Sequence, residues 1–242
     1  MVDNILVPSF TFVSASPTFT FMWQKNIHNL LITEHRKSPI KNEWYVKYDL
    51  YCNNKEGLSK IYNRAFEKAD TDYVICLHDD IVIHDIEIFE KIIKYSTQYD
   101  VMGLAGSSSF NINIADRKSW MQCSMDKQRH LHGSVTHDIP GYVGFYNTST
   151  YGYMPAPVCN IDGLFMVMKK DVYKNVKFDE QFTFDFYDLD YSLAALVANF
   201  KLGVIPLPCT HKSGGYGIME DKYLTAQALF VEKWKNLCVQ TV

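Results

Sequence analysis

The sequence predicts an α/β fold with a parallel central sheet, and three features of its first half indicate this class. Strand-like and helix-like segments alternate between residues 5 and 105. An apolar stripe with helical periodicity over residues 58–69 predicts an amphipathic helix. The continuous apolar run Tyr73–Leu77 follows it and is typical of a strand buried on both faces. Such alternation is the pattern of parallel-sheet α/β domains.

Other elements of the first half have weaker signals of the same kind. Strands are expected at 5–13, 44–51 and 101–105, and helices at 22–31 and 86–95. The strand at 44–51 ends in a turn signal, Cys52-Asn53-Asn54, and the strand at 73–77 ends at His78-Asp79-Asp80. Because α/β folds bind ligands beyond the carboxyl ends of their strands, both segments are expected at a binding edge.

The second half predicts fewer elements. Residues 107–160 show no clear element, and the uncharged stretch 139–161 is expected to be a long functional loop. A buried strand is expected at 163–168, a helix from 189 to about 200, a short strand at 204–207 and a closing helix at 222–234. The segment 211–215 reads as a flexible turn.

Composition narrows the class of protein. Apolar residues make up 47% and charged residues 21%, which excludes disordered and fibrous chains. The formal charge of −3 provides no basic excess, so no nucleic-acid partner is expected. The uncharged segment 4–24 is broken by Pro8, Pro17 and many Ser and Thr residues, so neither a signal peptide nor a membrane span is predicted. The six cysteines form no CxxC pair, which indicates a reducing compartment and a cytoplasmic protein.

Two adjacent acids, Asp79 and Asp80, follow the buried strand directly. Mg²⁺ is usually bound by one or two carboxylates together with substrate phosphates, and this pair can supply them. A plain turn, in which Asp side chains bond the local backbone, explains the dipeptide slightly better when it is taken alone. His211 can complete a carboxylate metal site, although a single His is more often filler on the surface or in the core.

Five acids lie among aromatic residues in the segment 178–190, just before a predicted helix. A helix cap accounts for one of them. It does not account for Asp188 and Asp190, which flank Leu189, the first residue of the apolar face of the helix. A carboxylate beside aromatic rings can have its pKa raised to the range of a general base, so these two acids are candidate bases.

Five motifs follow one another along the chain: His78-Asp79-Asp80, Asp162-Gly163-Leu164-Phe165, Phe178-Asp179-Glu180, Phe186-Tyr187-Asp188-Leu189-Asp190 and His211. In this order they resemble the GT-A-fold glycosyltransferases of the family 2 type, in particular the StrF-like glycosyltransferase domain, over about residues 50–215. The resemblance implies a GT-A (Rossmann-like) three-layer α/β/α sandwich with a mostly parallel central sheet, in a single domain over 1–242. Its nucleotide-binding half would be about 1–106, and its acceptor and catalytic half about 107–242.

The resemblance also implies roles for donor-side residues. His78-Asp79-Asp80 stands where the family has a D-x-D-like motif, with His in place of the first Asp. Asp80 would bind the metal, and His211 matches the position of a further ligand. The positions implied to contact the nucleotide-sugar donor are Asn53, His78, Asp79 and Asp162.

On the acceptor side, Tyr187-Asp188 stands in place of the family's Glu-Asp pair. Asp188 would therefore be the catalytic base, with Asp190 as the reserve. Phe184 and Tyr187 would stack on the acceptor sugar, while Trp120 and the 139–161 loop would cover it.

Enzymes of this family transfer a sugar from a nucleotide-sugar donor to an acceptor hydroxyl, usually with Mn²⁺ or Mg²⁺ and with inversion. The resemblance thus implies a metal-dependent glycosyltransferase whose partners are a nucleotide sugar and a glycan or other hydroxyl acceptor. The Arg-Trp signature of processive synthases is absent from the sequence, so transfer of a single sugar is expected.

Three other interpretations are open. A nucleotidyltransferase would use a similar metal site but release pyrophosphate. A carbohydrate-binding protein with an inactive transferase site would bind sugar or nucleotide without turnover, and the His78 and Tyr187 replacements are compatible with that. A pure interaction module is disfavoured because the acids gather at predicted strand and helix ends.

Overall fold

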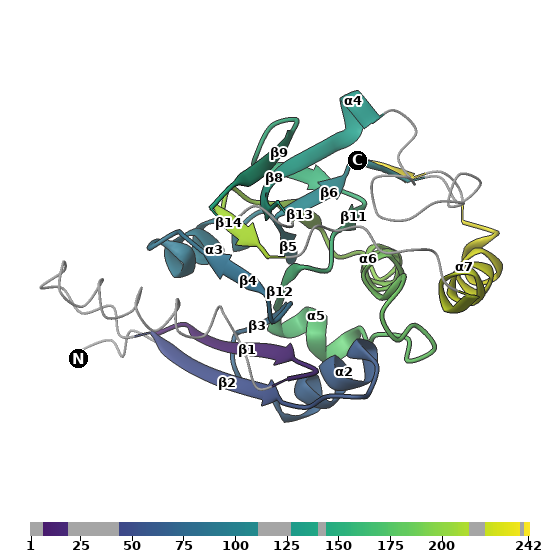
Figure 1. The fold of residues 1–242 in the computed structure, drawn as a ribbon, viewed down its shortest axis with the longest axis horizontal. Coiled ribbons are helices and arrows are strands. Elements are labelled where there is room, and N and C mark those ends of the chain that lie inside the picture. The colour runs from purple at the N-terminus through teal and green to yellow at the C-terminus, as the bar shows by residue number, and fades with distance from the viewer. Residues whose placement is uncertain (1–6, 19–43, 111–126, 140–143, 213–220, 238–239) are drawn as a thin grey trace, which may run out of the picture.

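A seven-stranded sheet forms the centre of the protein in the computed structural model, which describes residues 7–18, 44–110, 127–139, 144–212, 221–237 and 240–242 (Figure 1). From one edge to the other its strands are β10 (Ala156–Val158), β13 (Leu202–Val204), β5 (Val101–Gly103), β12 (Phe165–Lys169), β3 (Tyr73–Leu77), β1 (Ser9–Ala15) and β2 (Tyr45–Tyr51). The apolar run at 73–77 thus forms an interior strand, as predicted.

The central sheet is mixed, so the expectation of a mostly parallel sheet is not confirmed. β1 is parallel to β2 and β3, and β13 is parallel to β5. β12 is antiparallel to both of its neighbours, and β10 is antiparallel to β13. The prediction came from the first half of the chain, whereas β12 and β10 come from the second. An apolar run shows that a strand is buried but not which way it points.

Helices cover both faces of this sheet, as the three-layer prediction requires. Side chains alternate between the two faces of the sheet along a strand, so the contacts of β1 show which helix covers each face. Phe10 and Phe12 contact the ring of Phe89 in α3 (Ile88–Ser96). Thr11 points the other way and bonds Thr71, whose carbonyl oxygen accepts a hydrogen bond from a tyrosine of α5 (Lys170–Asn175).

The helix α2 (Leu58–Lys68) forms because its apolar positions recur at helical spacing, so that these side chains all face the same buried layer. Tyr62 and Phe66 are fully buried, and their rings pack on Phe178 at 5.3 and 5.5 Å between centroids. Each such ring contributes roughly 1.5–3 kcal/mol relative to an exposed position. Phe66 also contacts Tyr191 of α6 (Tyr187–Val197), so α2 and α6 share this layer.

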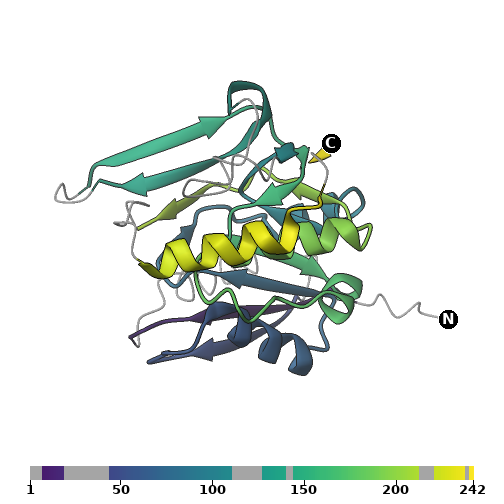
Figure 2. The ribbon, with the colours of Figure 1, turned by 90° about the vertical axis from the view of Figure 1, so that its right-hand side faces the viewer.

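A second sheet lies beside the first and corrects the prediction for residues 107–161. Its order is β11 (Asn160–Ile161), β6 (Ala105–Ser107), β8 (Leu131–Asp138), β14 (Cys209–His211) and β4 (Ile81–Ile83), with β9 (Tyr146–Tyr151) paired to β8. The β8–β9 hairpin projects from the body of the molecule (Figure 2). The expected loop at 139–161 therefore contains three strands in its described part. β9 was missed because it is mostly exposed and polar, so it lacks the alternation that marks a half-buried strand.

The remaining elements are short or lie at the end of the chain. They are α4 (Lys127–His130), α7 (Asp221–Trp234) and a small sheet of β7 (Ser109–Phe110) with β15 (Gln240–Thr241). The predicted helix at 22–31 and Trp120 lie outside the described residues. Within the described ranges, no helix is both long and apolar enough to cross a bilayer.

Candidate functional site

The turn 78–80 leads from β3 in the central sheet to β4 in the second sheet. The His78 amide donates to the Leu164 carbonyl oxygen at 3.0 Å, and the Lys212 amide donates to the Asp80 carbonyl oxygen at 2.9 Å. Antiparallel pairing of β4 with β14 sets Ile81 opposite His211. This register brings Asp80 next to His211, although 131 positions (211 − 80) separate them in the sequence.

Asp80 and His211 form a close pair, with 3.2 Å between Asp80 Oδ1 and His211 Nε2. Burial works against charge on both groups, but their mutual hydrogen bond and attraction prevail. The pKa of Asp80 is lowered and the pKa of His211 is raised, the signs expected of an ion pair. His211 is the last residue of β14 and is held by pairing to β4 and β8, so it does not lie in the flexible turn that the sequence predicted.

His78 joins this pair. One ligand atom from each of His78, Asp80 and His211 lies within 4.8 Å of the others, which is close to the spacing of ligands around one metal ion. Burial and the nearby His211 lower the pKa of His78, so its ring is neutral at neutral pH and offers a lone pair. Asp80 and His211 are thus close enough for the ligand role that the resemblance implies, and that role stays a prediction.

A third histidine, His137, also lies beside this group, and sequence reasoning missed it. The parallel pairing of β8 with β14 places His137 beside His211, with ring centroids 5.5 Å apart. No local pattern marks His137, because residues 107–160 predict no clear element. Only the register between β8 and β14 brings His137 next to His211.

Asp188 lies in the first turn of α6 and is half-buried. Its Oδ2 accepts a hydrogen bond from the Gly163 amide at 2.8 Å, and its Oδ1 accepts one from the Leu189 amide at 2.9 Å. Burial, and then the negative charge of Asp162, raise the pKa of Asp188 to about 7, although these backbone bonds oppose the shift. A carboxylate with a pKa near the working pH is suited to take a proton from a substrate.

Tyr187 and Gly163 connect Asp188 to His78. The Tyr187 hydroxyl donates to the Gly163 carbonyl oxygen at 2.9 Å and lies 3.1 Å from His78 Nε2. A Cβ on Gly163 would come within 2.1 Å of this hydroxyl, so the contact requires glycine. The negative charge of Asp162 also favours the protonated forms of His78 and His211, and it opposes the effect of burial on their pKa values.

The two aromatic residues expected to stack on an acceptor differ in exposure. Tyr187 is only 4% exposed and its hydroxyl is engaged, so the structure contradicts a stacking role for it. Phe184 is 61% exposed and its ring stacks on His78 with centroids 6.1 Å apart. Phe184 therefore remains available to a sugar ring at the edge of the site.

Asp190, the reserve base, contacts α7 instead of the His78 group. Its Oδ1 lies 2.7 Å from Lys233 Nζ and accepts a hydrogen bond from Trp234 Nε1 at 2.9 Å. The side chain is 1% exposed, and burial raises its pKa while Lys233 opposes the shift. Figure 2 shows α7 lying along the surface beside α6. These contacts give Asp190 a role in holding α7.

Asn53 and Asp79 lie at the same end of the sheet as His78, Asp80 and His211. Asn53 follows β2, which runs parallel to β1 and so ends at the same edge as β3. Asn53 is exposed and adopts a positive φ of 50°. Asp79 is half-buried in the turn between β3 and β4. Donor binding by Asn53, Asp79 and Asp162 stays a prediction.

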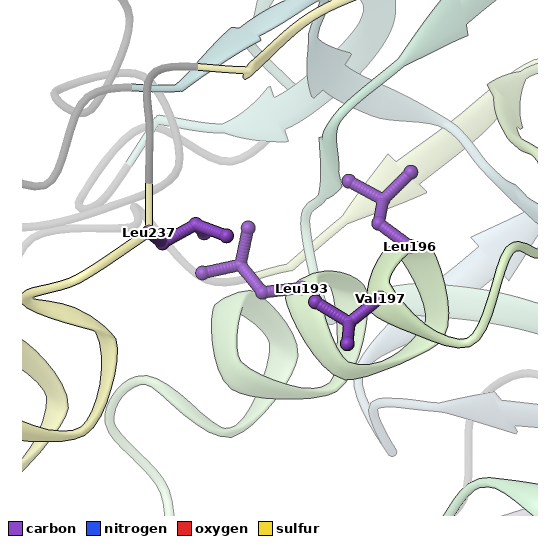
Figure 3. A pocket seen from close by; sticks show the side chains of 4 residues that line it. All are labelled: Leu193, Leu196, Val197 and Leu237. Carbon is purple, nitrogen blue, oxygen red and sulfur yellow. The ribbon is translucent and has the colours of Figure 1, made fainter.

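A small pocket elsewhere on the protein has the wrong chemistry for a sugar or a metal. It is lined by Leu193, Leu196 and Val197 of α6 and by Leu237 after α7 (Figure 3). These aliphatic side chains supply no hydrogen-bonding or ligand atoms. The pocket is a packing gap between α6 and the end of the chain.

Comparison with known proteins identifies the family. The profile of the Glycosyltransferase like family matches residues 46–234, which is most of the 242-residue chain. The protein therefore belongs to this glycosyltransferase family, and the expected transferase class and GT-A relationship are confirmed. No curated protein gives a significant match to the chain.

Solved structures show weaker likeness. A197 from STIV has 12% identity and a TM-score of 0.48, over 86% of this chain and 87% of that one. S. aureus TarS 1–349 has 12% identity and a TM-score of 0.45, over 84% and 60%. GalNAc-T7 with UDP, GalNAc and Mn²⁺ has 10% identity and a TM-score of 0.47, over 92% and 48%. At these values no substrate or residue role is transferred.

Proposed function

We propose that the protein transfers a single sugar from a nucleotide-sugar donor to an acceptor hydroxyl, with a divalent cation, Mn²⁺ or Mg²⁺, and with inversion. The observation that carries the proposal is the pairing of Asp80 with His211 at the end of β3, joined through Tyr187 and Gly163 to a carboxylate, Asp188, whose pKa is about 7. A metal-binding group and a base connected in this way match the two needs of the reaction.

The residues of the site fit a divalent cation. Asp80 and His211 already lie within the spacing of two ligands, because atoms that are each roughly 2.1 Å from one ion lie at most roughly 4.2 Å apart. The whole group, within 4.8 Å, needs only a small closure. A bound cation would offset the negative charge of the leaving diphosphate.

Asp188 would act as the base in a single displacement. It takes the proton of the acceptor hydroxyl while that oxygen forms a bond to the anomeric carbon. The bond from this carbon to the donor diphosphate breaks at the same time, and the diphosphate leaves with the electron pair. Attack from the face opposite the leaving group inverts the anomeric centre. The Gly163 and Leu189 amides fix both carboxylate oxygens, each of which keeps a lone pair for the proton.

The division of labour along the chain is also proposed. Residues of about 1–106, with Asn53 and Asp79 at the strand ends, would bind the nucleotide. Residues of about 107–242 would supply Asp162, the base and the acceptor site. The described cysteines Cys52, Cys76, Cys159 and Cys209 are free thiols, which supports a reducing, cytoplasmic setting.

A combined binding and turnover assay tests the proposal. Thermal shift with nucleoside diphosphates and sugar nucleotides, with and without Mn²⁺, measures donor binding, because a ligand of the folded state raises its apparent stability. Product analysis with a panel of acceptors measures transfer. Asp80→Ala should lose both, whereas Asp188→Asn should keep donor binding and lose transfer. Asp171→Asn, a change at an exposed acid in α5, is the matched control.

Three results would contradict the proposal in different ways. Pyrophosphate release from a nucleoside triphosphate and a sugar phosphate would establish the nucleotidyltransferase alternative. Donor binding without transfer to any acceptor would support the inactive, carbohydrate-binding alternative. Full transfer activity in the presence of a chelator would exclude the metal requirement.

A further inference from the structure

The hydroxyl of Tyr187 lies between two partners, and its single proton decides what each must do. The Gly163 carbonyl oxygen, 2.9 Å away, can only accept a hydrogen bond, so the Tyr187 hydroxyl donates its hydrogen bond to this oxygen. His78 Nε2, 3.1 Å away, must then carry the ring N–H and donate a hydrogen bond to the hydroxyl oxygen. A neutral imidazole carries one proton, so this arrangement leaves the lone pair on Nδ1 of His78.

The packing of Tyr187 makes this arrangement rigid. Its ring is buried and lies 6.0 Å from the ring of Tyr62 and 6.1 Å from that of Phe178. The missing Cβ of Gly163 gives the hydroxyl its place. On the other side, the ring of Phe184 stacks on His78 at an interplanar angle of 23°. Neither ring of the His78–Tyr187 pair can turn without breaking these contacts.

We propose that Tyr187 is a positioning residue that presents Nδ1 of His78 as a third metal ligand, so that the site selects a first-row transition metal over Mg²⁺. The proposal rests on the metal site of the proposed function and gives His78 a different role from the donor contact that the resemblance implies. Metal-bound histidines commonly donate their second ring N–H to a fixed partner, which orients the ring and sets its tautomer. Here Tyr187 is that partner.

The resulting ligand set explains the selectivity. Mg²⁺ prefers oxygen ligands in a near-ideal octahedron, and imidazole suits transition metals better. His78, Asp80 and His211 offer two imidazoles and one carboxylate within 4.8 Å of one another. A His at position 78, where the family motif has Asp, therefore moves the site away from Mg²⁺.

Metal titration of the metal-free 242-residue chain tests the proposal without any transfer assay. Isothermal titration with Co²⁺, Mn²⁺ and Mg²⁺ would be carried out on wild type, Tyr187→Phe, His78→Ala and the double variant. The Co²⁺ absorption bands report the ligand set directly. We expect wild type to bind Co²⁺ and Mn²⁺ more tightly than Mg²⁺, and each single variant to lose about 10- to 100-fold in Co²⁺ affinity. Mg²⁺ affinity should change much less.

The double variant separates positioning from a general structural effect. If Tyr187 acts through His78, its removal should cost nothing more once His78 is absent, so the double variant should match His78→Ala. Tyr191→Phe is the matched control, because Tyr191 lies one turn further along α6 and its buried hydroxyl has no hydrogen-bond partner among the described residues. It should bind Co²⁺ as wild type does.

Distinct outcomes overturn distinct statements. If wild type binds no divalent cation even with a nucleoside diphosphate present, the metal part of the proposed function fails and this inference fails with it. If wild type binds Co²⁺ but Tyr187→Phe and His78→Ala bind it equally well with unchanged absorption, only the inference is refuted. Additive losses in the double variant would also refute it. If Tyr187→Phe does not fold, His78→Ala and His78→Asp provide the test. His78→Asp should shift the metal preference toward Mg²⁺. If the ratio of Co²⁺ affinity to Mg²⁺ affinity stays unchanged, the inference is overturned.

Discussion

Replacement of Asp188 by Asn should change both the chemistry and the pH dependence of stability. Asn cannot take a proton, so transfer should fall by about 10²–10⁴-fold, the usual effect of removing a general base. In wild type, transfer should rise with pH until Asp188 is ionised, near its pKa of about 7. Below that value the rate should fall about tenfold for each pH unit, because only the ionised carboxylate accepts the proton.

The stability effect follows from the same pKa. Folding raises the pKa of Asp188 from an ordinary value of 3.8 to about 7, so the native state binds the proton more tightly than the unfolded chain does. The resulting stabilisation is complete below the unfolded pKa and is lost as the pH rises through about 7. Three units correspond to at most about 4 kcal/mol. Because Asp188 is only half-buried, solvent screening reduces this to about 2–3 kcal/mol.

Denaturant unfolding at about pH 4 and about pH 8 measures this difference as a linkage effect. The unfolding free energy of wild type, relative to that of Asp188→Asn, should fall by about 2–3 kcal/mol between the two pH values. Asn offers only one acceptor for the Gly163 and Leu189 amides, so its absolute stability also changes, but that loss is the same at both pH values. A difference that does not vary with pH would show that the pKa of Asp188 is not raised. Normal transfer by Asp188→Asn would remove it as the base.

Three further predictions concern its neighbours. Asp190→Asn should lower the unfolding free energy by about 1–3 kcal/mol, because it weakens a buried contact with Lys233. Its turnover, measured well below the melting temperature, should stay near that of wild type. A stable variant without activity would make Asp190 the base. Gly163→Ala should lower the unfolding free energy by about 1–3 kcal/mol and remove most of the activity, because the added Cβ displaces Tyr187. A denaturation curve like that of wild type would contradict the close contact. Phe184→Ala should change the unfolding free energy by less than about 0.5 kcal/mol but raise the KM for the acceptor. Steady-state kinetics with varied acceptor concentration measures this, and an unchanged KM would exclude stacking.

The sequence alone determined the elements whose signal is local. The strand at 73–77 and the helix at 58–68 were predicted almost to the residue, because burial on both faces leaves an unbroken apolar run and burial on one helical face leaves a stripe. The acids at 79, 80, 188 and 190 were recognisable because they interrupt such patterns at their ends. Family membership, which the motif order indicated, was confirmed independently.

Only the tertiary structure decided which residues meet. Strand direction leaves no trace in an apolar run, so the antiparallel placement of β12 and the exposed polar strand β9 were beyond sequence reasoning. Local sequence patterns did not distinguish Asp188 from Asp190, and only the resemblance ranked Asp188 first with Asp190 in reserve. They were separated because residues two apart on a helix point in different directions, Asp188 toward Gly163 and Asp190 toward Lys233. Likewise, the contacts of His211 with Asp80 and His137 depend on the pairing register of β14 with β4 and β8, which is a property of the folded sheet and of no single segment.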